Sequence, residues 1–155
     1  GLFKEVGESL VNYNKDINVK FELLESYIYR SVKDPKIYHD AVVVAPNLYG
    51  DIITDLNSGL AVGSLGMTPS ANIGTDVSIF EAVHGSAPDI AGKDLANPSA
   101  MLFAGCMLLE HVGLGEYSDK IKKAALATIA EGIKTGDLKG KSTNSEYTDA
   151  ICAKL

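Results

Sequence analysis

Apolar side chains recur at helical spacing at the start of the chain and through most of its second half. In the first 13 residues, Leu2, Phe3, Val6, Leu10 and Val11 share one face of a helix that turns 100° per residue. This spacing predicts an amphipathic helix that begins with the chain. Similar spacing predicts further helices over residues 48–63, 99–114, 118–136 and 145–155, and a short helix that ends before Pro35.

Residues that favour helix ends mark several of these boundaries. Asn97 is a good N-cap for the helix predicted at 99–114, and Pro98 suits the first helical position. Ser118 is placed to cap the next helix. Gly63 and Gly136 are placed to end helices, because glycine readily adopts the left-handed backbone that follows a last turn.

Three segments have the pattern of strands. Residues 17–29 alternate apolar and polar side chains through Val19, Phe21 and Leu23. Residues 40–47 hold a continuous run of valines, which is typical of a buried, parallel strand. Residues 77–83 predict a short strand that follows a turn-rich stretch, 64–74. Strands that alternate with helices indicate an α/β fold.

Composition excludes some classes of partner. Of the 155 residues, 46% are apolar and 22% are charged, as in ordinary globular domains, and the net charge is −6. The negative charge argues against nucleic acid or an anionic membrane as the main partner. No apolar run reaches the roughly 18 residues that span a bilayer. The chain starts without methionine inside a helical pattern, so we expect it to be a piece of a longer protein.

Two aspartates stand one helical turn apart. Asp51 and Asp55 share a helix face, and no basic residue nearby in the sequence relieves their repulsion. They would follow the carboxyl end of the predicted strand 40–47, where α/β proteins usually bind ligands. A Mg²⁺ or Mn²⁺ ion would turn the repulsion into binding. On spacing alone, a solvated acidic face is the favoured interpretation, and Glu25, near the end of the first predicted strand, reads as a surface acid.

The stretch from Ser78 to Ala100 is rich in small residues around one histidine. Small side chains at Gly85, Ala87, Ala91 and Gly92 let a ligand approach the backbone closely. The neighbouring polar and aromatic groups suit an adenosine-shaped ligand: a ring for stacking at His84, a hydroxyl at Ser86, an acid for ribose at Asp89 and an amide for adenine at Asn97. An ordinary loop with a structural histidine is the alternative, and the residues alone do not decide.

Two long segments resemble one enzyme family. "NLYGDIITDLNSGLAVGSLG" (47–66) and "FEAVHGSAPDIAGKDLANPSA" (80–100) are similar to the β-decarboxylating dehydrogenases, which act on isocitrate, 3-isopropylmalate or homoisocitrate. The similarity is highest to the catalytic subunits of fungal mitochondrial NAD-dependent isocitrate dehydrogenases. The resemblance implies the family's α/β fold and the carboxyl-terminal portion of a two-domain subunit. Residues 1–61 would complete a small dimer-forming domain, and residues 62–155 would form half of a large cofactor-binding domain.

The resemblance also assigns metal ligands. Asp51 and Asp55 match the carboxylates that hold Mg²⁺ or Mn²⁺ with the substrate. Glu25 matches an acid that the neighbouring subunit lends to the site. The family usually has Asp there, followed by Asn, whereas this chain has Glu25 and Ser26. The longer side chain shifts the carboxylate by about one methylene, so the metal geometry must adjust or the ligand is weakened.

Cofactor contacts follow in the same way. The resemblance places His84, Gly85, Ser86, Ala87 and Asn97 around the adenosine part of the cofactor, and Glu81 near its nicotinamide end. NADP-using relatives have Lys and Tyr where this chain has Asp89 and Ile90. An acid there repels a 2′-phosphate and accepts hydrogen bonds from free ribose hydroxyls. The implied cofactor is therefore NAD.

The implied activity is oxidative decarboxylation of isocitrate to 2-oxoglutarate and CO₂, in the mitochondrial matrix, by an oligomer of homologous subunits. The family's substrate arginines and serine and its catalytic tyrosine and lysine would lie upstream of Gly1, so no catalytic residue is assigned within the chain. Two alternatives stay open: 3-isopropylmalate or homoisocitrate dehydrogenase, and a non-catalytic regulatory subunit. Such subunits typically lose the acidic pair or the "HGSAPDI" loop, and this chain keeps both.

Overall fold

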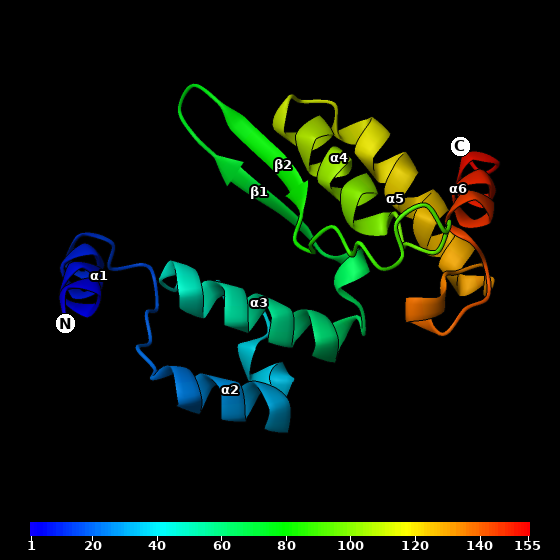
Figure 1. Ribbon diagram of the computed structural model, residues 1–155. Helices are drawn as coiled ribbons and strands as arrows, with labels where there is room; N and C mark the ends of the chain where they lie inside the picture. The colour runs from blue at the N-terminus through cyan, green and yellow to red at the C-terminus, as the bar shows by residue number, and fades with distance from the viewer. The chain divides into compact units, whose positions relative to one another are not determined.

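The computed structural model describes all residues from 1 to 155, and they form two compact units. The first unit runs from Gly1 to Leu60 and the second from Ala61 to Leu155. Figure 1 labels the helices and strands of both units. No helix combines the length and the apolar character that crossing a membrane requires.

The first unit is helical. Its elements are α1 (Leu2–Tyr13), α2 (Leu24–Lys33), the 3-10 helix η1 (Pro35–Tyr38) and α3 (Asn47–Ala61), whose last residue belongs to the second unit. The predicted helix at the amino end is confirmed as α1, although it buries none of its residues. The helix before Pro35 is confirmed as α2, and α3 ends close to Gly63, which has a left-handed φ of 80°.

Both strands predicted in this unit are wrong. The segment 18–23 is irregular, and the chain then turns into α2, so Glu25 lies in the first turn of a helix. Residues 41–46 form no strand, and Val42 is 90% exposed. A strand exists only through hydrogen bonds to a neighbouring strand, and the structure pairs neither segment with one. The β-branched run at 42–44 is therefore an exposed apolar surface here.

A polar network joins α2, α3 and η1. Glu22, just before α2, accepts hydrogen bonds from Arg30 Nη1 at 2.7 Å and from Tyr38 Oη at 2.6 Å. The ring centroids of Tyr38 and Tyr27 lie 4.6 Å apart, and Asn57 of α3 donates to Tyr27 Oη at 3.1 Å. Partial removal from water, together with the Glu22 carboxylate, raises the pKa of Tyr38 to about 12. This network fixes the helix that carries Glu25.

The second unit combines a hairpin with three helices. Its elements are η2 (Leu65–Met67), β1 (Pro69–Ile73), β2 (Ser78–Ala82), α4 (Ser99–His111), α5 (Gly115–Ala130), η3 (Gly136–Leu138) and α6 (Asn144–Cys152). The two strands are antiparallel, with Pro69 opposite Ala82 and Ile73 opposite Ser78. The strand predicted at 77–83 is confirmed as β2. Its partner β1 lies within the stretch 64–74, which the sequence predicts to be turn-rich, so this part of that prediction is wrong; Pro69 and Asn72 are of types that are depleted in strands. Proline is tolerated as the first residue of a strand.

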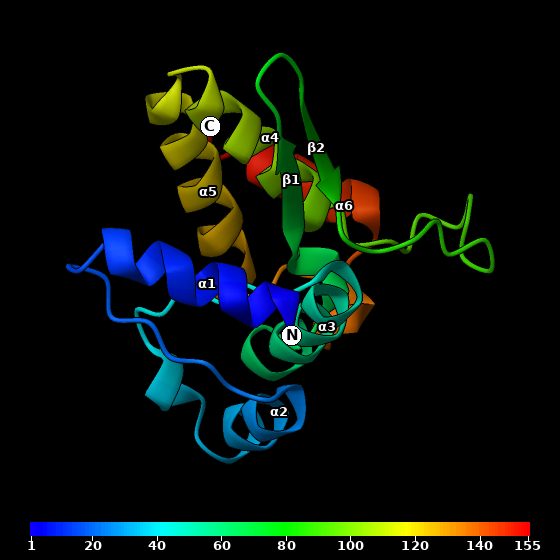
Figure 2. The same cartoon turned by 90° about the vertical axis from the view of Figure 1, so that its left-hand side faces the viewer.

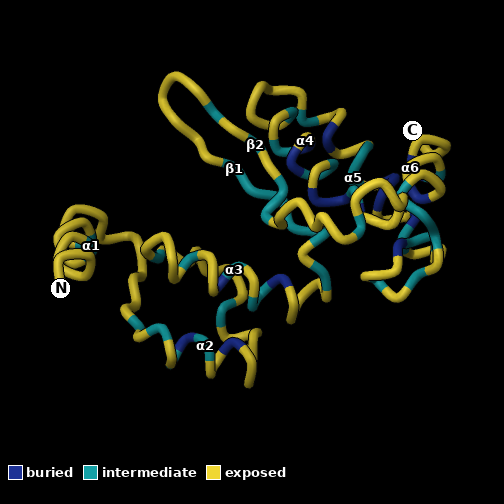
Figure 3. The backbone as a smooth tube through the Cα atoms, in the orientation of Figure 1, coloured by how far each residue is buried: buried dark blue, intermediate teal, exposed yellow.

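The core of the second unit lies where its helices meet. α4 packs against both strands and against α5, and α5 also packs against α6. Figures 2 and 3 show α4 beside the hairpin, and Figure 3 shows dark blue, buried segments on α4, α5 and α6. Ala125 and Tyr147 are fully buried, and Ile151 is 3% exposed. Alanines on α4 and α5 allow the close approach of the two helices.

The limits of the last three helices refine the sequence prediction. Helices over 99–114, 118–136 and 145–155 exist as α4, α5 and α6. However, α5 begins at Gly115 and ends at Ala130, so neither Ser118 nor Gly136 marks its ends. Ser118 is buried inside the helix, where its hydroxyl donates to Glu110, and the left-handed residue after the helix is Gly132, with φ of 88°. Leu126 of α5 is 57% exposed.

Candidate functional site

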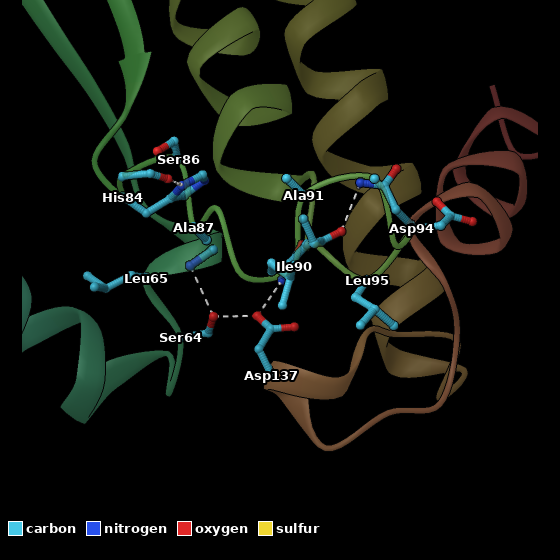
Figure 4. A pocket seen from close by; sticks show the side chains of 16 residues that line it. Ser64, Leu65, His84, Ser86, Ala87, Ile90, Ala91, Asp94, Leu95 and Asp137 are labelled. Carbon is cyan, nitrogen blue, oxygen red and sulfur yellow. Dashed lines mark hydrogen bonds between the residues drawn. The ribbon is translucent and has the colours of Figure 1, made fainter.

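The second unit contains an open pocket of about 540 Å³. Roughly 300–1,000 Å³ is the usual range for small-molecule sites. Four segments line the pocket: the turn at η2, the loop between β2 and α4, η3 and the start of α6 (Figure 4). The lining residues are Ser64, Leu65, Gly66, His84, Gly85, Ser86, Ala87, Ile90, Ala91, Gly92, Asp94, Leu95, Ala96, Asn97, Asp137 and Asn144.

The loop between β2 and α4 has an unusual backbone. Ala87 and Asp94 have φ of 41° and 56°, in the left-handed region that residues with a side chain seldom occupy. Two turns shape the loop, because Ile90 N donates to Ala87 O and Lys93 N donates to Ile90 O, each at 3.1 Å. Such conformations persist where the surrounding structure holds them, and they are frequent at ligand sites.

Most of the predicted cofactor residues line this pocket. His84, Gly85, Ser86, Ala87, Ile90 and Asn97 all do so. His84 is exposed, and its Nδ1 lies 2.9 Å from the carbonyl oxygen of Gly85. The other two predicted residues are not among the lining residues. Asp89 is exposed in the same loop, and Glu81 lies on β2, where it accepts a hydrogen bond from Asn72 at 3.0 Å.

The loop is anchored to the start of α6. Asn144 N donates to Asp94 O at 2.8 Å, and Asn144 Nδ2 donates to Ala96 O at 2.8 Å. The Asp94 carboxylate accepts from Ser145 N at 3.1 Å and from its hydroxyl at 3.0 Å. A capping box of Thr143 and Glu146 begins this helix. The end of the loop that leads into α4 is therefore fixed before any ligand binds.

Asn97 forms hydrogen bonds with two partners. Its Oδ1 accepts from Ser99 N at 3.0 Å, so its side chain does bond to the first residue of α4, but the N-cap is Pro98 and the helix begins one residue later than the predicted cap implies. Its Nδ2 donates to Asp137 Oδ2 at 2.9 Å. Partial burial alone would raise the pKa of Asp137, but hydrogen bonds from Ser64, Thr135 and Asn97 outweigh it and lower that pKa below its usual value. Asp137 therefore carries a negative charge at neutral pH.

Four lining residues with polar side chains escaped sequence reasoning: Ser64, Asp94, Asp137 and Asn144. Asp137 is 40 residues from Asn97 and 73 from Ser64 along the chain. Nothing in the local pattern links such distant positions. The one available signal is weak: "TGD" at 135–137 is a short polar turn after a helix, the type of segment that often lines α/β pockets.

The predicted metal ligands lie in the first unit. Asp51 and Asp55 are exposed on α3, and neither forms an ion pair. Contrary to expectation, the segment before them is not a strand. Glu25 is exposed in the first turn of α2. No group of three or more His, Cys, Asp or Glu side chains in this chain is placed to hold a metal ion. The two aspartates supply hard oxygen donors of the type that Mg²⁺ and Mn²⁺ prefer, but they form only part of a coordination shell.

These features define an α/β protein with a nucleoside-sized pocket and an unpaired acidic helix face. The model of the isocitrate/isopropylmalate dehydrogenase family matches residues 1–151. The chain belongs to this family. The resemblance drawn from the two motif segments is thereby confirmed.

Curated relatives include subunits of one enzyme from several eukaryotes. The chain is 56% identical over its whole length to the mitochondrial isocitrate dehydrogenase [NAD] subunit 2 of Kluyveromyces lactis, and 46% identical to subunit alpha of the mitochondrial enzyme of Bos taurus. It covers 43% and 42% of these proteins, respectively. The chain thus spans about two fifths of the length of the curated relatives that it matches.

Solved structures show the same fold. An isocitrate dehydrogenase from Methylococcus capsulatus matches 99% of the chain with a TM-score of 0.93 and 41% identity, and the match covers 45% of that protein. A β-decarboxylating dehydrogenase from Thermococcus kodakarensis matches 99% of the chain with a TM-score of 0.83 and 33% identity, over 44% of its own length. The predicted α/β fold of this family is confirmed.

Proposed function

We propose that the chain is the carboxyl-terminal portion of a subunit of an NAD-dependent isocitrate dehydrogenase, which oxidatively decarboxylates isocitrate to 2-oxoglutarate and CO₂. The observation that carries the proposal is the pocket built by the 84–97 loop in a chain of this family. Relatives named as NAD-dependent isocitrate dehydrogenase subunits support the choice of reaction. The same relatives are named as mitochondrial proteins, which supports a location in the mitochondrial matrix. They are also named as subunits, which supports assembly into an oligomer of homologous chains.

The pocket fits the adenosine end of NAD. Its volume suffices for a nucleoside, and the exposed ring of His84 offers a flat surface for the base. Gly85 has no side chain that would keep a ligand from the backbone. Asp89 accepts hydrogen bonds from the two ribose hydroxyls, and its charge repels the 2′-phosphate of NADP. Ile90 lines the pocket beside it, and Glu81 serves the nicotinamide end.

The acidic face of α3 fits part of a divalent metal site. Asp51 and Asp55 hold Mg²⁺ or Mn²⁺ together with substrate oxygens, and Glu25 of a neighbouring subunit adds a further carboxylate. When bound, the metal supplies Lewis-acid stabilisation of negative charge on the substrate. The two aspartates, free of ion pairs, are available for this role without breaking an existing contact.

The domain assignment belongs to the same proposal. Residues 1–61 complete a small, dimer-forming domain, and residues 62–155 form the carboxyl-terminal half of the cofactor-binding domain. The groups that clamp the substrate carboxylates and transfer its proton come from sequence upstream of Gly1.

Substitution of the metal ligand Asp51 tests the proposal. In the complete protein with its partner subunits, Asp51→Asn should lower turnover of isocitrate with NAD by at least about a hundredfold and weaken Mn²⁺ binding, because one anionic ligand is lost. Asp16→Asn changes another exposed acid to an amide, and it should leave turnover and Mn²⁺ affinity within twofold of the wild-type values. Unchanged metal dependence in Asp51→Asn contradicts the metal assignment.

Substrate preference tests the reaction itself. The complete wild-type protein should oxidise isocitrate faster than 3-isopropylmalate or homoisocitrate, and it should prefer NAD over NADP. If the protein oxidises 3-isopropylmalate or homoisocitrate faster, that acid is the substrate and the proposal of isocitrate is wrong. Binding of isocitrate or AMP without turnover, even with partner subunits present, would instead identify a regulatory subunit.

A further inference from the structure

Asp137 connects three separate parts of the pocket. Its Oδ1 accepts a hydrogen bond from Thr135 Oγ1 at 2.5 Å, and its Oδ2 accepts from Asn97 Nδ2 at 2.9 Å. The hydroxyl of Ser64 also donates to Oδ2, and Figure 4 shows the two side chains pointing toward each other. The donors belong to the turn before β1, the loop before α4 and the segment that leads into η3. One carboxylate thus joins segments that the sequence keeps far apart.

Asn97 is held at both ends of its amide. Its oxygen accepts a hydrogen bond from Ser99 N, at the first residue of α4, and its nitrogen donates to Asp137. The residue is only 8% exposed. The orientation of the amide is fixed because the carboxylate can receive only the NH₂ group. Without Asp137, the Nδ2 group would lose the partner that holds it on this side.

Gly66 shows how closely this cluster is packed. A Cβ atom on Gly66 would lie 2.9 Å from Asn97 Cβ, 3.1 Å from Asp137 Oδ2 and 3.2 Å from Ser64 Oγ. All three distances are shorter than ordinary van der Waals contact, so an added methyl group must push the cluster apart. Gly66 N also donates to Ser64 Oγ at 3.0 Å. The turn at η2 is therefore fitted to the same carboxylate.

We propose that Asp137 is a positioning residue for the cofactor, which holds Asn97 and the Ser64–Gly66 turn so that the adenosine end of NAD meets a preformed pocket floor. The inference rests on the proposed NAD-dependent function. Asp137 acts through its neighbours and takes no part in hydride transfer. Preformed sites bind more tightly, because less ordering remains to be done when the ligand arrives.

The test measures binding of NADH and of ADP-ribose to the complete enzyme with its partner subunits. ADP-ribose contains the adenosine end of the cofactor and lacks nicotinamide. Asp137→Ala removes all three acceptor contacts and should raise both Kd values about tenfold, by a similar factor. The kcat at saturating NAD and the KM for isocitrate should stay within twofold, because the reacting atoms lie at the other end of the cofactor.

Asp137→Asn separates hydrogen bonding from charge. Its amide oxygen can accept from Asn97 and Ser64, and its NH₂ group can donate to the Thr135 hydroxyl, which serves as donor or acceptor. This variant should keep Kd within about threefold of wild type. Gly66→Ala, which leaves Asp137 in place but crowds the cluster, should weaken binding nearly as much as Asp137→Ala. Ser64→Ala removes a single donor to Asp137 and should raise Kd about threefold. This variant tests the inference if Asp137→Ala fails to fold.

Glu110→Ala is the matched control. This carboxylate accepts from Ser118 and Lys122, between α4 and α5 and outside the pocket. Its loss should lower thermal stability without changing either Kd by more than twofold. If Glu110→Ala weakens NADH binding as much as Asp137→Ala, the effect is general destabilisation and the inference is overturned.

A double-mutant cycle with Asn97 completes the test. Because Asp137 acts through Asn97 and through the Ser64–Gly66 turn, adding Asp137→Ala to Asn97→Ala should raise the Kd for NADH by only about the threefold expected from the Ser64 contact, and not by the full tenfold. Additive effects overturn the inference, as does an Asp137→Ala variant that binds NADH as wild type does. The wild-type enzyme tests the proposed function separately. If it binds no NADH, both the NAD-dependent function and this inference are wrong. If it binds NADH but the variants do not behave as expected, only the inference about Asp137 is wrong.

Discussion

The two units of the chain differ in how much of their apolar surface they bury. In residues 1–60, the buried positions are Tyr27, Ser31, Ile53 and Ser58, whereas Val42 and Val44 are 90% and 75% exposed. In residues 61–155, α4, α5 and α6 share a core around Ala125 and Tyr147. The second unit thus forms a core from its own residues, while the first presents apolar surface of the kind that partner chains cover.

The difference agrees with the proposed domain roles. A dimer-forming domain is expected to present apolar surface when it is described as a single chain, because the partner subunit covers that surface in the assembly. A cofactor-binding unit must instead hold its pocket in one shape. The bonds from Asp94, Asn97 and Asp137 that fix the pocket all lie within residues 61–155. Rigidity is therefore found where the proposed cofactor binds.

Expressing the two parts of the chain separately, with the cut after residue 62 so that α3 stays whole, should give the largest effect. We expect residues 1–62 to be largely unfolded alone, because so few buried side chains cannot offset the roughly 1–2 kcal/mol of backbone entropy lost for each ordered residue. Residues 63–155 should keep their helices. Circular dichroism and urea denaturation measure both. A cooperative unfolding transition for residues 1–62 would contradict the comparison.

Core truncation should give the next largest effect. Tyr147 is fully buried, and its hydroxyl lies 2.9 Å from that of Ser99. Tyr147→Ala in the 155-residue chain should lower the free energy of unfolding by about 3–5 kcal/mol. Val42→Ala is the matched change in the first unit and should cost less than about 0.5 kcal/mol, because Val42 is already in solvent. Equal losses, measured by urea denaturation, would show that the first unit packs as tightly as the second.

A smaller effect on stability is expected at alkaline pH, from the hydrogen bond between Tyr38 and Glu22 in the first unit. The pKa of Tyr38 is raised from its ordinary 10.0 to about 12, so its contribution to stability is complete below pH 10 and is lost as pH rises through about 12. Tyr38→Phe removes the hydrogen bond to Glu22 and should cost about 1 kcal/mol at neutral pH. In an alkaline absorbance titration, the variant should lack one late-titrating tyrosine. Loss of a tyrosine that titrates near pH 10 would contradict this assignment.

Local signals in the sequence predicted the helices well. Apolar spacing located α1, α3 and α4, and Asn97 lies next to the start of α4, where it accepts a hydrogen bond from Ser99 N. The α5 boundaries shifted because Ser118 packs against Glu110 inside the helix, a tertiary contact that overrides its capping preference. Where the decisive interaction lay within about one turn of helix, sequence reasoning succeeded.

Strands and pocket residues depend on contacts that are distant in sequence. The valines at 42–44 have strand propensity but no partner strand, whereas β1 forms from poor strand residues because β2 pairs with it. The motif around His84 indicated one wall of the pocket. The part of the pocket at Ser64 and Asp137 could not be predicted from the sequence, because folding brings together residues 73 positions apart.

Hydrogen–deuterium exchange of the complete enzyme, with and without NADH, tests the central claim most directly. If the pocket in residues 61–155 binds the adenosine end of NAD, NADH should slow exchange in the 84–97 loop, at 64–67 and at 135–138. The exposed segment 41–46 should not respond to NADH in the same way. Protection elsewhere, with the 84–97 loop exchanging at its unliganded rate, would contradict the account.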